Sequence, residues 1–425
     1  MIRTLEYQSF PLDHVSEFKK KMLNWLRPFS IFCYLDNQRY GFEPHQAECL
    51  VGVGVYDFVQ GTDIKTADEF LKRKEWAFGH LSYELQHPAH QLSLSKEDKI
   101  GFPLFYFFHP QVVLEVGSNQ VTIHGTHPEK IFAEIVATPF ESKASAPSAI
   151  AVNPSLSKEA YMQKIRQLQA HIQRGDCYEI NFCQEFSASG VDIDPFACFE
   201  NLMRVSPNPF SAFYRLHDKY LLCASPERFL AKKGGRVYSQ PIKGTSKRNL
   251  QSAAEDDKLK QALRQSQKEQ SENVMVVDLV RNDLTKICRE ASVKVDELFG
   301  VYSFPQVHQL ISTVSGEVKE DLCFSNIVEA LFPMGSMTGA PKHRVMQLID
   351  EYEVSSRGIF SGSVGYIHPD GDFDFNVVIR SIMYNATRQF LSYQVGSGIT
   401  IYSDAEQEWE ECMVKAEAIR QVLAL

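Results

Sequence analysis

The sequence predicts an α+β protein in which antiparallel strands form the core and long helices cover it. Strand-like runs follow one another directly, instead of alternating with helices as in a parallel sheet, in residues 177–188, 220–244 and 361–401. Long segments of helix-forming residues separate these runs, at residues 157–174, 252–275 and 404–425. Hydrophobic residues make up 44% of the chain, which is enough for a large core.

The length of the chain and a change in composition predict two parts joined by a linker. The 425 residues exceed the usual size of a domain with a single core. Residues 136–156 are rich in Ala, Ser and Pro and lack hydrophobic periodicity, which is typical of a connection between folded parts. We therefore expect an N-terminal lobe at residues 1–135 and a larger region at residues 157–425.

Charge and cysteine usage exclude several classes of protein. The 44 basic and 53 acidic residues give a net charge of −9, so we expect neither a nucleic-acid-coating protein nor a membrane-surface protein. The nine cysteines are scattered and never spaced as C-x-x-C, as expected for reduced thiols in the cytoplasm. No run approaches the ~18 to 20 apolar residues of a membrane helix, and MIRTLEYQSF lacks the apolar core of a signal peptide.

Local signals place the elements of the larger region. Ser157 is a candidate N-cap for a helix whose apolar periodicity ends at Gly175. Lys243 follows a strand-like run and is expected at the exit of a strand. The turn signals PDGD and NATR within residues 361–401 predict an antiparallel meander. The segment from Asp404 predicts an amphipathic C-terminal helix.

Lys243 lies in the segment QPIKGTSKRN, between Pro241 and the pair Gly244-Thr245. A phosphate-binding P-loop needs its lysine after the second glycine, in the order G-x-x-x-x-G-K-[ST]. Here the lysine precedes Gly244, so this segment does not fit a P-loop. A chemical nucleophile and ordinary surface charge both remain possible for Lys243, while Lys247 and Arg248 are expected to be solvated.

Two acidic pairs lie on predicted helices, Glu269 with Glu272 and Glu408 with Glu411. The i,i+3 spacing places both carboxylates of a pair on one helix face. Two such faces that meet could hold Mg²⁺ through hard oxygen ligands and leave positions open for a substrate. From spacing alone, a solvated charged face is the more common explanation, because Glu-rich helices usually display their charge to water.

The segment FPMGSMTGAPKHRVM, residues 332–346, combines a Gly-containing turn with the start of a helix beside Lys342 and Arg344. The free N–H groups of such a helix end can bind a carboxylate. A simple loop-to-helix junction explains the segment equally well.

Two further segments suit anion binding, again with simpler alternatives. Arg380 ends the strand-like run FNVVI, and QVGSG offers Gly396 and Gly398 for close backbone approach, so together they would suit a dianionic substrate. A capping ion pair would explain Arg380 equally well. His308 lies in the apolar run FPQVHQLIS, where a hydrogen-bonded core histidine is the more common explanation.

The motifs of the larger region resemble, in their order, those of the chorismate-utilising enzymes, which include anthranilate, aminodeoxychorismate, isochorismate and salicylate synthases. They are SPERF (225–229), PIKGT (241–245), ENVMVVDLVRNDL (272–284), FPQVHQLIS (304–312), FPMGSMTGAPK (332–342), GSVGY (362–366), VVIRS (377–381), VGSGI (395–399) and EWEECMVKA. In the N-terminal third the resemblance is weaker and is carried by FGHLSYEL (78–85) and YLDN (34–37). The resemblance implies a large antiparallel core of two sheets packed as a sandwich and flanked by helices, with residues 157–425 as the chorismate-binding catalytic region.

The loop around Lys243 separates the branches of this family. Anthranilate synthases have alanine at this position, whereas PIKGT resembles the aminodeoxychorismate synthase branch, whose lysine is a covalent nucleophile. Isochorismate and salicylate synthases carry a water-activating lysine at the position of Glu179. The resemblance therefore implies amination of chorismate to 4-amino-4-deoxychorismate for 4-aminobenzoate and folate synthesis. An anthranilate synthase component I is the alternative, followed by a non-catalytic chorismate-binding subunit.

The resemblance also implies the roles of the site residues. Lys243 would be the nucleophile, Glu227 the general acid for the departing hydroxyl, and His308 would lie beside that hydroxyl. Mg²⁺ would be held chiefly by Glu272 and Glu411, with support from Glu269 and Glu408. The anionic groups of chorismate would be bound by Gly244, Thr245, Ser336, Arg380, Gly396, Ser397, Gly398 and Lys415.

A partner is implied as well. Free ammonia at neutral pH is mostly ammonium, and the family obtains unprotonated ammonia from a separate glutamine amidotransferase subunit. The chain is too short to carry such a domain in addition, so we expect a glutaminase partner. No lyase domain is recognisable, so the step to 4-aminobenzoate would need another enzyme.

Overall fold

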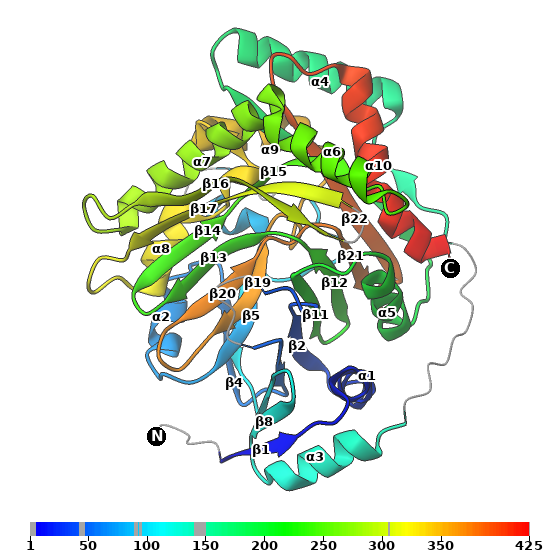
Figure 1. Cartoon of the computed structure of the whole chain (residues 1–425), viewed down its shortest axis with the longest axis vertical. Helices are drawn as coiled ribbons and strands as arrows, with labels where there is room; N and C mark the ends of the chain where they lie inside the picture. The colour runs from blue at the N-terminus through cyan, green and yellow to red at the C-terminus, as the bar shows by residue number, and fades with distance from the viewer. Residues whose placement is uncertain are drawn as a thin grey trace.

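The computed structural model describes residues 6–41, 47–88, 92, 96–139, 150–304 and 307–424. Within these residues, one antiparallel sheet has 12 strands and a second antiparallel sheet has 10. Helices cover the outer faces of both sheets (Figure 1). The predicted α+β class, with a two-sheet core flanked by helices, is confirmed.

The larger sheet runs in the order β1-β8-β7-β3-β2-β11-β12-β21-β22-β10-β18, and β9 pairs with β10. Its strands are β1 (Tyr7–Pro11), β2 (Ile31–Asp36), β3 (Cys49–Val53), β7 (Val112–Val116), β8 (Gln120–His124), β9 (Asn153–Pro154), β10 (Glu179–Ser189), β11 (Phe210–Leu216), β12 (Lys219–Ser225), β18 (Gly339–Ala340), β21 (Ser381–Asn385) and β22 (Phe390–Ile399).

The smaller sheet runs in the order β15-β17-β14-β13-β20-β19-β5-β6-β4, and β16 pairs with β17. Its strands are β4 (Asp57–Gly61), β5 (Ala77–Leu81), β6 (Phe105–His109), β13 (Arg228–Lys233), β14 (Arg236–Gln240), β15 (Ile242–Lys247), β16 (Lys294–Ser303), β17 (Val307–Glu317), β19 (Ser363–Ile367) and β20 (Phe373–Asn376).

The helices fall into two groups by the sheet on which they pack. The hydrophobic cluster on the outer face of the larger sheet includes residues of α1 (Val15–Trp25), α3 (Pro128–Ala137), α4 (Lys158–Gln173), α5 (Pro195–Val205), α9 (Lys342–Tyr352) and α10 (Ala405–Ala424). The smaller sheet is covered by α2 (Thr66–Leu71), α6 (Ala253–Gln265), α7 (Gln267–Ile287) and α8 (Phe324–Leu331). Two short 3₁₀ helices, η1 (Tyr83–Gln86) and η2 (Gly335–Met337), lie in loops.

The two sheets pack face to face over one hydrophobic core. In β2, Cys33 lies in the hydrophobic cluster between the two sheets, and its neighbour Phe32 lies in the cluster between the larger sheet and its helices. Neighbouring side chains of a strand point to opposite faces, so β2 is buried on both faces. A Cβ at Gly52 would overlap the ring of Phe78 from the other sheet, so the two layers approach closely there. The His80 ring also reaches across the core to the Tyr214 hydroxyl at 3.1 Å.

The residues before and after the predicted linker build both sheets together. In the larger sheet β2 pairs with β11, and in the smaller sheet β5 pairs with β19. Strands from residues 1–135 are therefore hydrogen-bonded to strands from residues 157–425 in each layer. Residues 140–149 of the predicted linker lie outside the described residues.

Several predicted elements are present, and three differ in detail. Helix α4 begins after Ser157, whose hydroxyl accepts a hydrogen bond from Ala160 N at 3.2 Å. The helix predicted from residue 252 is two helices, because Ser266 ends α6 and caps α7. The predicted meander is also wrong in one respect, since β19 and β20 belong to the smaller sheet and β21 and β22 to the larger one.

Lys243 is the third difference. It lies near the start of β15, just after Pro241, rather than at the exit of a strand. Proline lacks an N–H group, and the chain leaves β14 at Gln240 and resumes as β15 at Ile242. The register of β15 against β17 then shifts between Ile242 and Thr245, which encloses Lys243 and Gly244.

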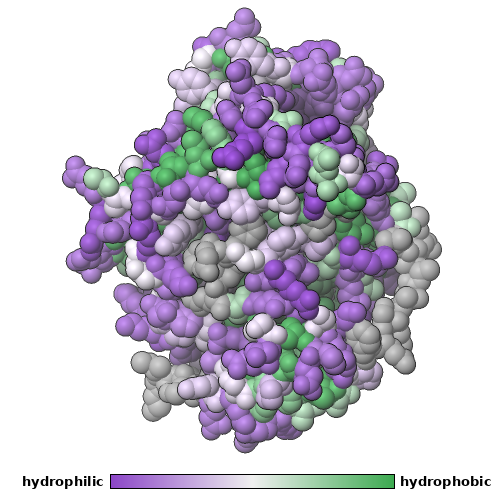
Figure 2. Space-filling model, viewed as in Figure 1, coloured by the Kyte–Doolittle hydropathy of each residue, from purple (hydrophilic) through white to green (hydrophobic). Residues whose placement is uncertain are grey.

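The surface agrees with the composition. Figure 2 shows hydrophilic residues over most of one face, with hydrophobic residues in several separate patches. Within the described ranges, no helix combines the length and apolar character that crossing a membrane requires.

Candidate active site

Lys243 is the centre of the predicted site. Its Nζ lies 2.5 Å from Glu179 Oε1 on β10 and 3.9 Å from Glu272 Oε2 on α7. Only 14% of the lysine side chain and 9% of the Glu179 side chain are exposed, so this ion pair is shielded from bulk water. Elements from both sheets therefore meet at this amine.

The surroundings of Lys243 favour its charged form. Burial alone would lower the pKa of the amine, but the carboxylates of Glu179, Glu272 and Glu411 outweigh burial and raise that pKa above its ordinary value. A neutral lysine nucleophile requires the opposite shift. For Lys243 to act as a nucleophile, its ammonium group must first lose a proton. Glu179 Oε1 is in direct contact with Lys243 Nζ, which carries that proton.

Glu227 has the properties of a proton donor. It is buried, and this burial raises the pKa of its carboxyl to about 7, against the hydrogen bond from Ser336 and the charge of Lys243. Arg380, at the end of the VVIR segment, is partly buried, and the loss of solvation lowers its pKa to about 10, although the charge of Glu227 opposes this shift. The structure thus places Glu227, Ser336, Lys243 and Arg380 in one neighbourhood.

The two predicted acidic pairs lie on α7 and α10, and Glu269 of the first pair is close enough to Glu411 of the second to be affected by its charge. Burial raises the pKa of Glu269 and of Glu272. The negative charge of Glu411 also contributes to the raised pKa of Glu269. Burial would raise the pKa of Glu411 too, but Lys415, with its Nζ at 2.7 Å, lowers that pKa overall. The interpretation of these helix faces as purely solvated charge is therefore wrong for Glu269 and Glu272.

The carboxylates fit a divalent cation by their chemistry. They are hard oxygen donors, and Glu408 has one buried carboxylate oxygen without a hydrogen-bond partner in the described part of the chain. Among the described residues, however, no group of three or more His, Cys, Asp or Glu side chains lies close enough together to hold a metal ion. Binding of a cation would therefore require the carboxylates to move toward each other.

Glycines make room for this site in two strands. In β22, a Cβ at Gly398 would overlap both Lys243 Nζ and Glu179 Oε1. Gly396 on the same strand accepts a hydrogen bond from Lys415 Nζ at 2.9 Å, and Ser397 between them is buried. Gly244 has a φ of +100°, and a Cβ there would lie 3.0 Å from Glu269 Oε2. Thr245, the next residue, is exposed.

His308 is buried in β17, opposite Ser246 of β15. Its Nδ1 lies 2.8 Å from Ser303 Oγ, and its Nε2 lies 3.1 Å from Asp256 Oδ1. Both ring nitrogens are therefore engaged, as expected for a hydrogen-bonded core histidine. Its place beside a departing hydroxyl stays a prediction.

The structure corrects two further expectations. Lys342 does not offer a free charge at the start of α9, because its Nζ binds Asp283 Oδ2 at 2.7 Å and the Leu331 carbonyl at 2.8 Å. Arg248 is not a solvated charge, because its Nη2 donates to Asp256 Oδ2 at 2.7 Å.

Sequence reasoning missed the contact between Glu179 and Lys243. In the sequence, Glu179 was notable only because isochorismate and salicylate synthases have a lysine at this position. The contact depends on β10 and β15, which belong to different sheets, so no local sequence signal could predict it.

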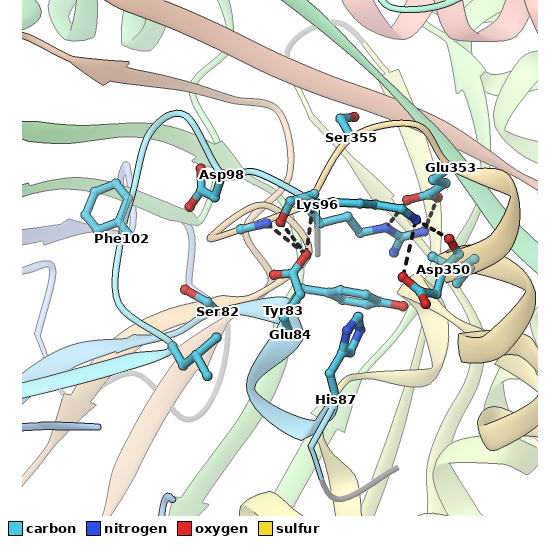
Figure 3. A pocket seen from close by; sticks show the side chains of 15 residues that line it. Ser82, Tyr83, Glu84, His87, Lys96, Asp98, Phe102, Asp350, Glu353 and Ser355 are labelled. Carbon is cyan, nitrogen blue, oxygen red and sulfur yellow. Dashed lines mark hydrogen bonds and ion pairs between the residues drawn. The ribbon is translucent and has the colours of Figure 1, made fainter. Parts of the chain in front are cut away.

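A cavity of about 170 Å³ lies at a different place (Figure 3). Its walls come from residues 82–87, 96–104 and 349–358, and include Glu84, Lys96, Asp350, Glu353 and Arg357. None of the predicted site residues lines it. This cavity is therefore separate from the predicted site around Lys243.

Known proteins share both the sequence and the fold of this chain. It is 42% identical over 265 residues to aminodeoxychorismate synthase component 1 of Salmonella typhimurium, a match that spans 62% of this chain and 58% of that protein. It is 30% identical over 379 residues to aminodeoxychorismate synthase component 1 of Bacillus subtilis, which covers 85% of this chain and 80% of that protein. An anthranilate synthase component I-like protein of Synechocystis is 32% identical over 353 residues, which covers 81% of this chain and 72% of that protein.

Solved structures agree on the fold. Anthranilate synthase component I of Streptococcus pneumoniae superposes with a TM-score of 0.74 at 24% identity, over 99% of this chain and 94% of that one. MenF, the menaquinone-specific isochorismate synthase of Escherichia coli, gives a TM-score of 0.76 at 18% identity, over 99% of this chain and 95% of that one. The family model of chorismate binding enzymes matches residues 42–421, and the chain therefore belongs to the chorismate binding enzyme family.

Proposed function

We propose that this chain aminates chorismate to 4-amino-4-deoxychorismate through a covalent adduct on Lys243. Family membership supports chorismate as the substrate, and the relatives named aminodeoxychorismate synthase component 1 support the product. The observation that carries the proposal is the position of Lys243, a shielded amine beside Glu179. Its charge also acts on the buried carboxyl of Glu227, whose pKa is about 7.

The first proposed step forms the adduct and releases water. The proton of Lys243 leaves first, and Glu179 is the nearest acceptor. The neutral Nζ then attacks C2 of chorismate, the ring double bonds shift, and the C4–O bond breaks. Hydroxide is too basic to leave unaided, so protonated Glu227 donates the proton that turns it into water. A pKa of about 7 allows Glu227 to hold this proton near neutral pH.

The second proposed step releases the lysine. Ammonia attacks C4, the double bonds shift back, and the C2–N bond to Lys243 breaks. The enolpyruvyl ether stays on the ring throughout. The charges of Arg380 and Lys415, together with the backbone around Gly396 and Gly398, would hold the two carboxylates of chorismate.

A divalent cation is part of the proposal. Glu272 and Glu411, supported by Glu269 and Glu408, would hold Mg²⁺. When bound, the ion would supply a positive charge for the carboxylate of chorismate. The raised pKa values of Glu269 and Glu272 and the buried oxygen of Glu408 support this assignment.

A partner that supplies ammonia completes the proposal. The words "component 1" in the names of the relatives imply a second component, which we propose to be a glutamine amidotransferase. An ammonium salt at about pH 8.5 should replace this partner, because more of the ammonium is then unprotonated.

The test is mass spectrometry of the product formed by the purified chain from chorismate, Mg²⁺ and an ammonium salt. We expect 4-amino-4-deoxychorismate, which retains the enolpyruvyl group, and we expect a chelator to abolish its formation. Release of pyruvate with anthranilate would contradict the proposal and favour anthranilate synthesis. Undiminished turnover in the chelator would remove Mg²⁺ from it.

A further inference from the structure

A second buried ion pair lies behind the proposed site. Arg357 Nη2 lies 2.6 Å from Glu353 Oε1, and Arg357 Nε donates to Glu353 Oε2 at 2.9 Å. Only 1% of the arginine side chain and 3% of the glutamate side chain are exposed. Burial of such an ion pair costs desolvation free energy, and hydrophobic residues of similar volume often stabilise a fold at least as well. Its contacts therefore need an explanation beyond simple packing.

The ion pair is hydrogen-bonded to two segments next to the proposed site, η2 and β10. Arg357 Nη1 donates to the Met337 carbonyl at 2.6 Å, and Arg357 Nη2 donates to the Asn181 carbonyl at 2.9 Å. Glu353 Oε1 accepts a hydrogen bond from Cys183 N at 2.8 Å. Met337 follows Ser336 in η2, and Asn181 lies two residues after Glu179 in β10.

Asn181 then connects these segments to each other. Its side-chain nitrogen donates to the Ser336 carbonyl at 3.1 Å, and its backbone N donates to the Thr338 carbonyl at 2.7 Å. It also lies opposite Gly398 in the register of β10 and β22. Through Met337 and Asn181, Arg357 is therefore connected to η2 and β10, and Asn181 is paired with β22 next to Lys243.

The N-terminal segment holds this arginine from its other side. The ring of Tyr83 lies under the guanidinium, with Arg357 Cζ 4.4 Å from the ring centroid. Glu84 Oε1 accepts hydrogen bonds from Arg357 N at 2.8 Å and from Ser356 Oγ at 2.7 Å. In Figure 3, Tyr83, Glu84 and Glu353 surround one cavity, although they come from segments far apart in the sequence.

We propose that Tyr83 and Glu84 are positioning residues for the reaction at Lys243, acting through the Arg357–Glu353 ion pair. This inference rests on the proposed function, because it concerns the same site. It assigns a role to the segment FGHLSYEL, which lies outside the region of predicted catalytic residues. A planar guanidinium has five N–H donors, so Arg357 can form two hydrogen bonds to the Glu353 carboxylate and still bind two backbone carbonyl groups. A lysine ammonium is a point charge and cannot reproduce this arrangement.

The experiment measures kcat, KM and the melting temperature of four variants with chorismate and an ammonium salt. Arg357→Lys keeps the charge and removes the planar fork, and we expect kcat to fall about 10- to 100-fold with a smaller change in KM, because misplacing reacting groups by about 1 Å has effects of that size. Tyr83→Leu removes the ring under the guanidinium, and we expect a fall in kcat of several-fold.

Two matched controls separate positioning from general stability. Tyr83→Phe keeps the ring and removes a hydroxyl that has no hydrogen-bond partner among the described residues, so kcat should match that of the wild type. Lys19→Met removes another shielded charge, whose Nζ lies 2.8 Å from Asp36, and should lower the melting temperature without changing kcat.

The outcomes distinguish the two proposals. Unchanged kcat in both Arg357→Lys and Tyr83→Leu would overturn the positioning role while the proposed function stands. An equal fall in kcat in the Lys19→Met control would also overturn it. If the wild type does not aminate chorismate, the proposed function fails, and the positioning role is then judged by calorimetric binding of chorismate. Weaker binding in Arg357→Lys and Tyr83→Leu, but not in Tyr83→Phe, would support it, and equal binding would reject it.

Discussion

Two shielded cations, Arg357 and Lys243, both contact strand β10, and their surroundings differ. The Arg357 guanidinium has five N–H bonds and makes five hydrogen bonds, to Glu353, Met337, Asn181 and Ser361. Lys243 has one short contact, at 2.5 Å with Glu179, and a longer one at 3.9 Å with Glu272. Each N–H bond of the Arg357 guanidinium therefore has an acceptor, whereas Lys243 has fewer charged contacts among the described residues.

The chemistry of the two side chains fits this difference. A guanidinium does not lose its proton in proteins, so Arg357 can only hold other groups in place. An amine can lose its proton and then becomes a nucleophile. The molecule therefore has an arginine where rigidity is needed and a lysine where reactivity is proposed. Substitutions at the two positions should accordingly affect different measurements.

The largest expected effect is on turnover, at Lys243. Lys243→Ala removes the proposed nucleophile, so we expect the rate of chorismate amination to fall on the order of 10³-fold or more. Mass spectrometry of enzyme quenched during turnover should show the adduct in the wild type and none in the variant. Lys247→Ala is the matched control, because Lys247 is an exposed lysine on the same strand. Undiminished turnover in Lys243→Ala would exclude the covalent mechanism.

A large effect on stability is expected at Arg357. Arg357→Met leaves the Glu353 carboxylate buried without its cation, which should lower the free energy of unfolding by about 3 to 5 kcal/mol. Arg388→Met removes an exposed arginine whose Nη1 lies 3.3 Å from Glu97, and it should cost about 1 kcal/mol or less. Urea unfolding followed by circular dichroism measures both. Equal losses in the two variants would show that the buried pair contributes no more than a surface pair.

Local sequence signals predicted the parts of this molecule that depend on neighbouring residues. Ser157 and Gly175 marked the ends of α4. The placement of Lys243 and Glu227 in one site came instead from the resemblance to the chorismate-utilising enzymes. The spacing of Ser266 and Glu269 also fits a helix start, and this signal could have predicted the break between α6 and α7.

Contacts between distant segments could not be predicted in this way. Glu179 meets Lys243 because strands of two different sheets begin at the same place. Tyr83 meets Arg357 because β5, which ends just before Tyr83, pairs with β19, which begins shortly after Arg357. The division of residues 361–401 between two sheets depends on the same long-range pairing. Hydrophobic alternation identifies a strand, but it does not identify the sheet to which the strand belongs.

The smallest effect concerns the pH dependence of the lysine. The carboxylate of Glu179 helps to raise the pKa of Lys243, against the lowering effect of burial. Glu179→Gln keeps the size of the side chain and removes its charge, so the pKa of Lys243 should fall. At a given pH more of the amine is then neutral. In a plot of the rate of adduct formation against pH, the rising limb should therefore move to lower pH.

Glu185→Gln, the same change further along β10, should leave that limb in place. An unmoved limb in Glu179→Gln would mean that Glu179 does not control the charge of Lys243, and the contrast with the fixed Arg357 would lose its electrostatic basis.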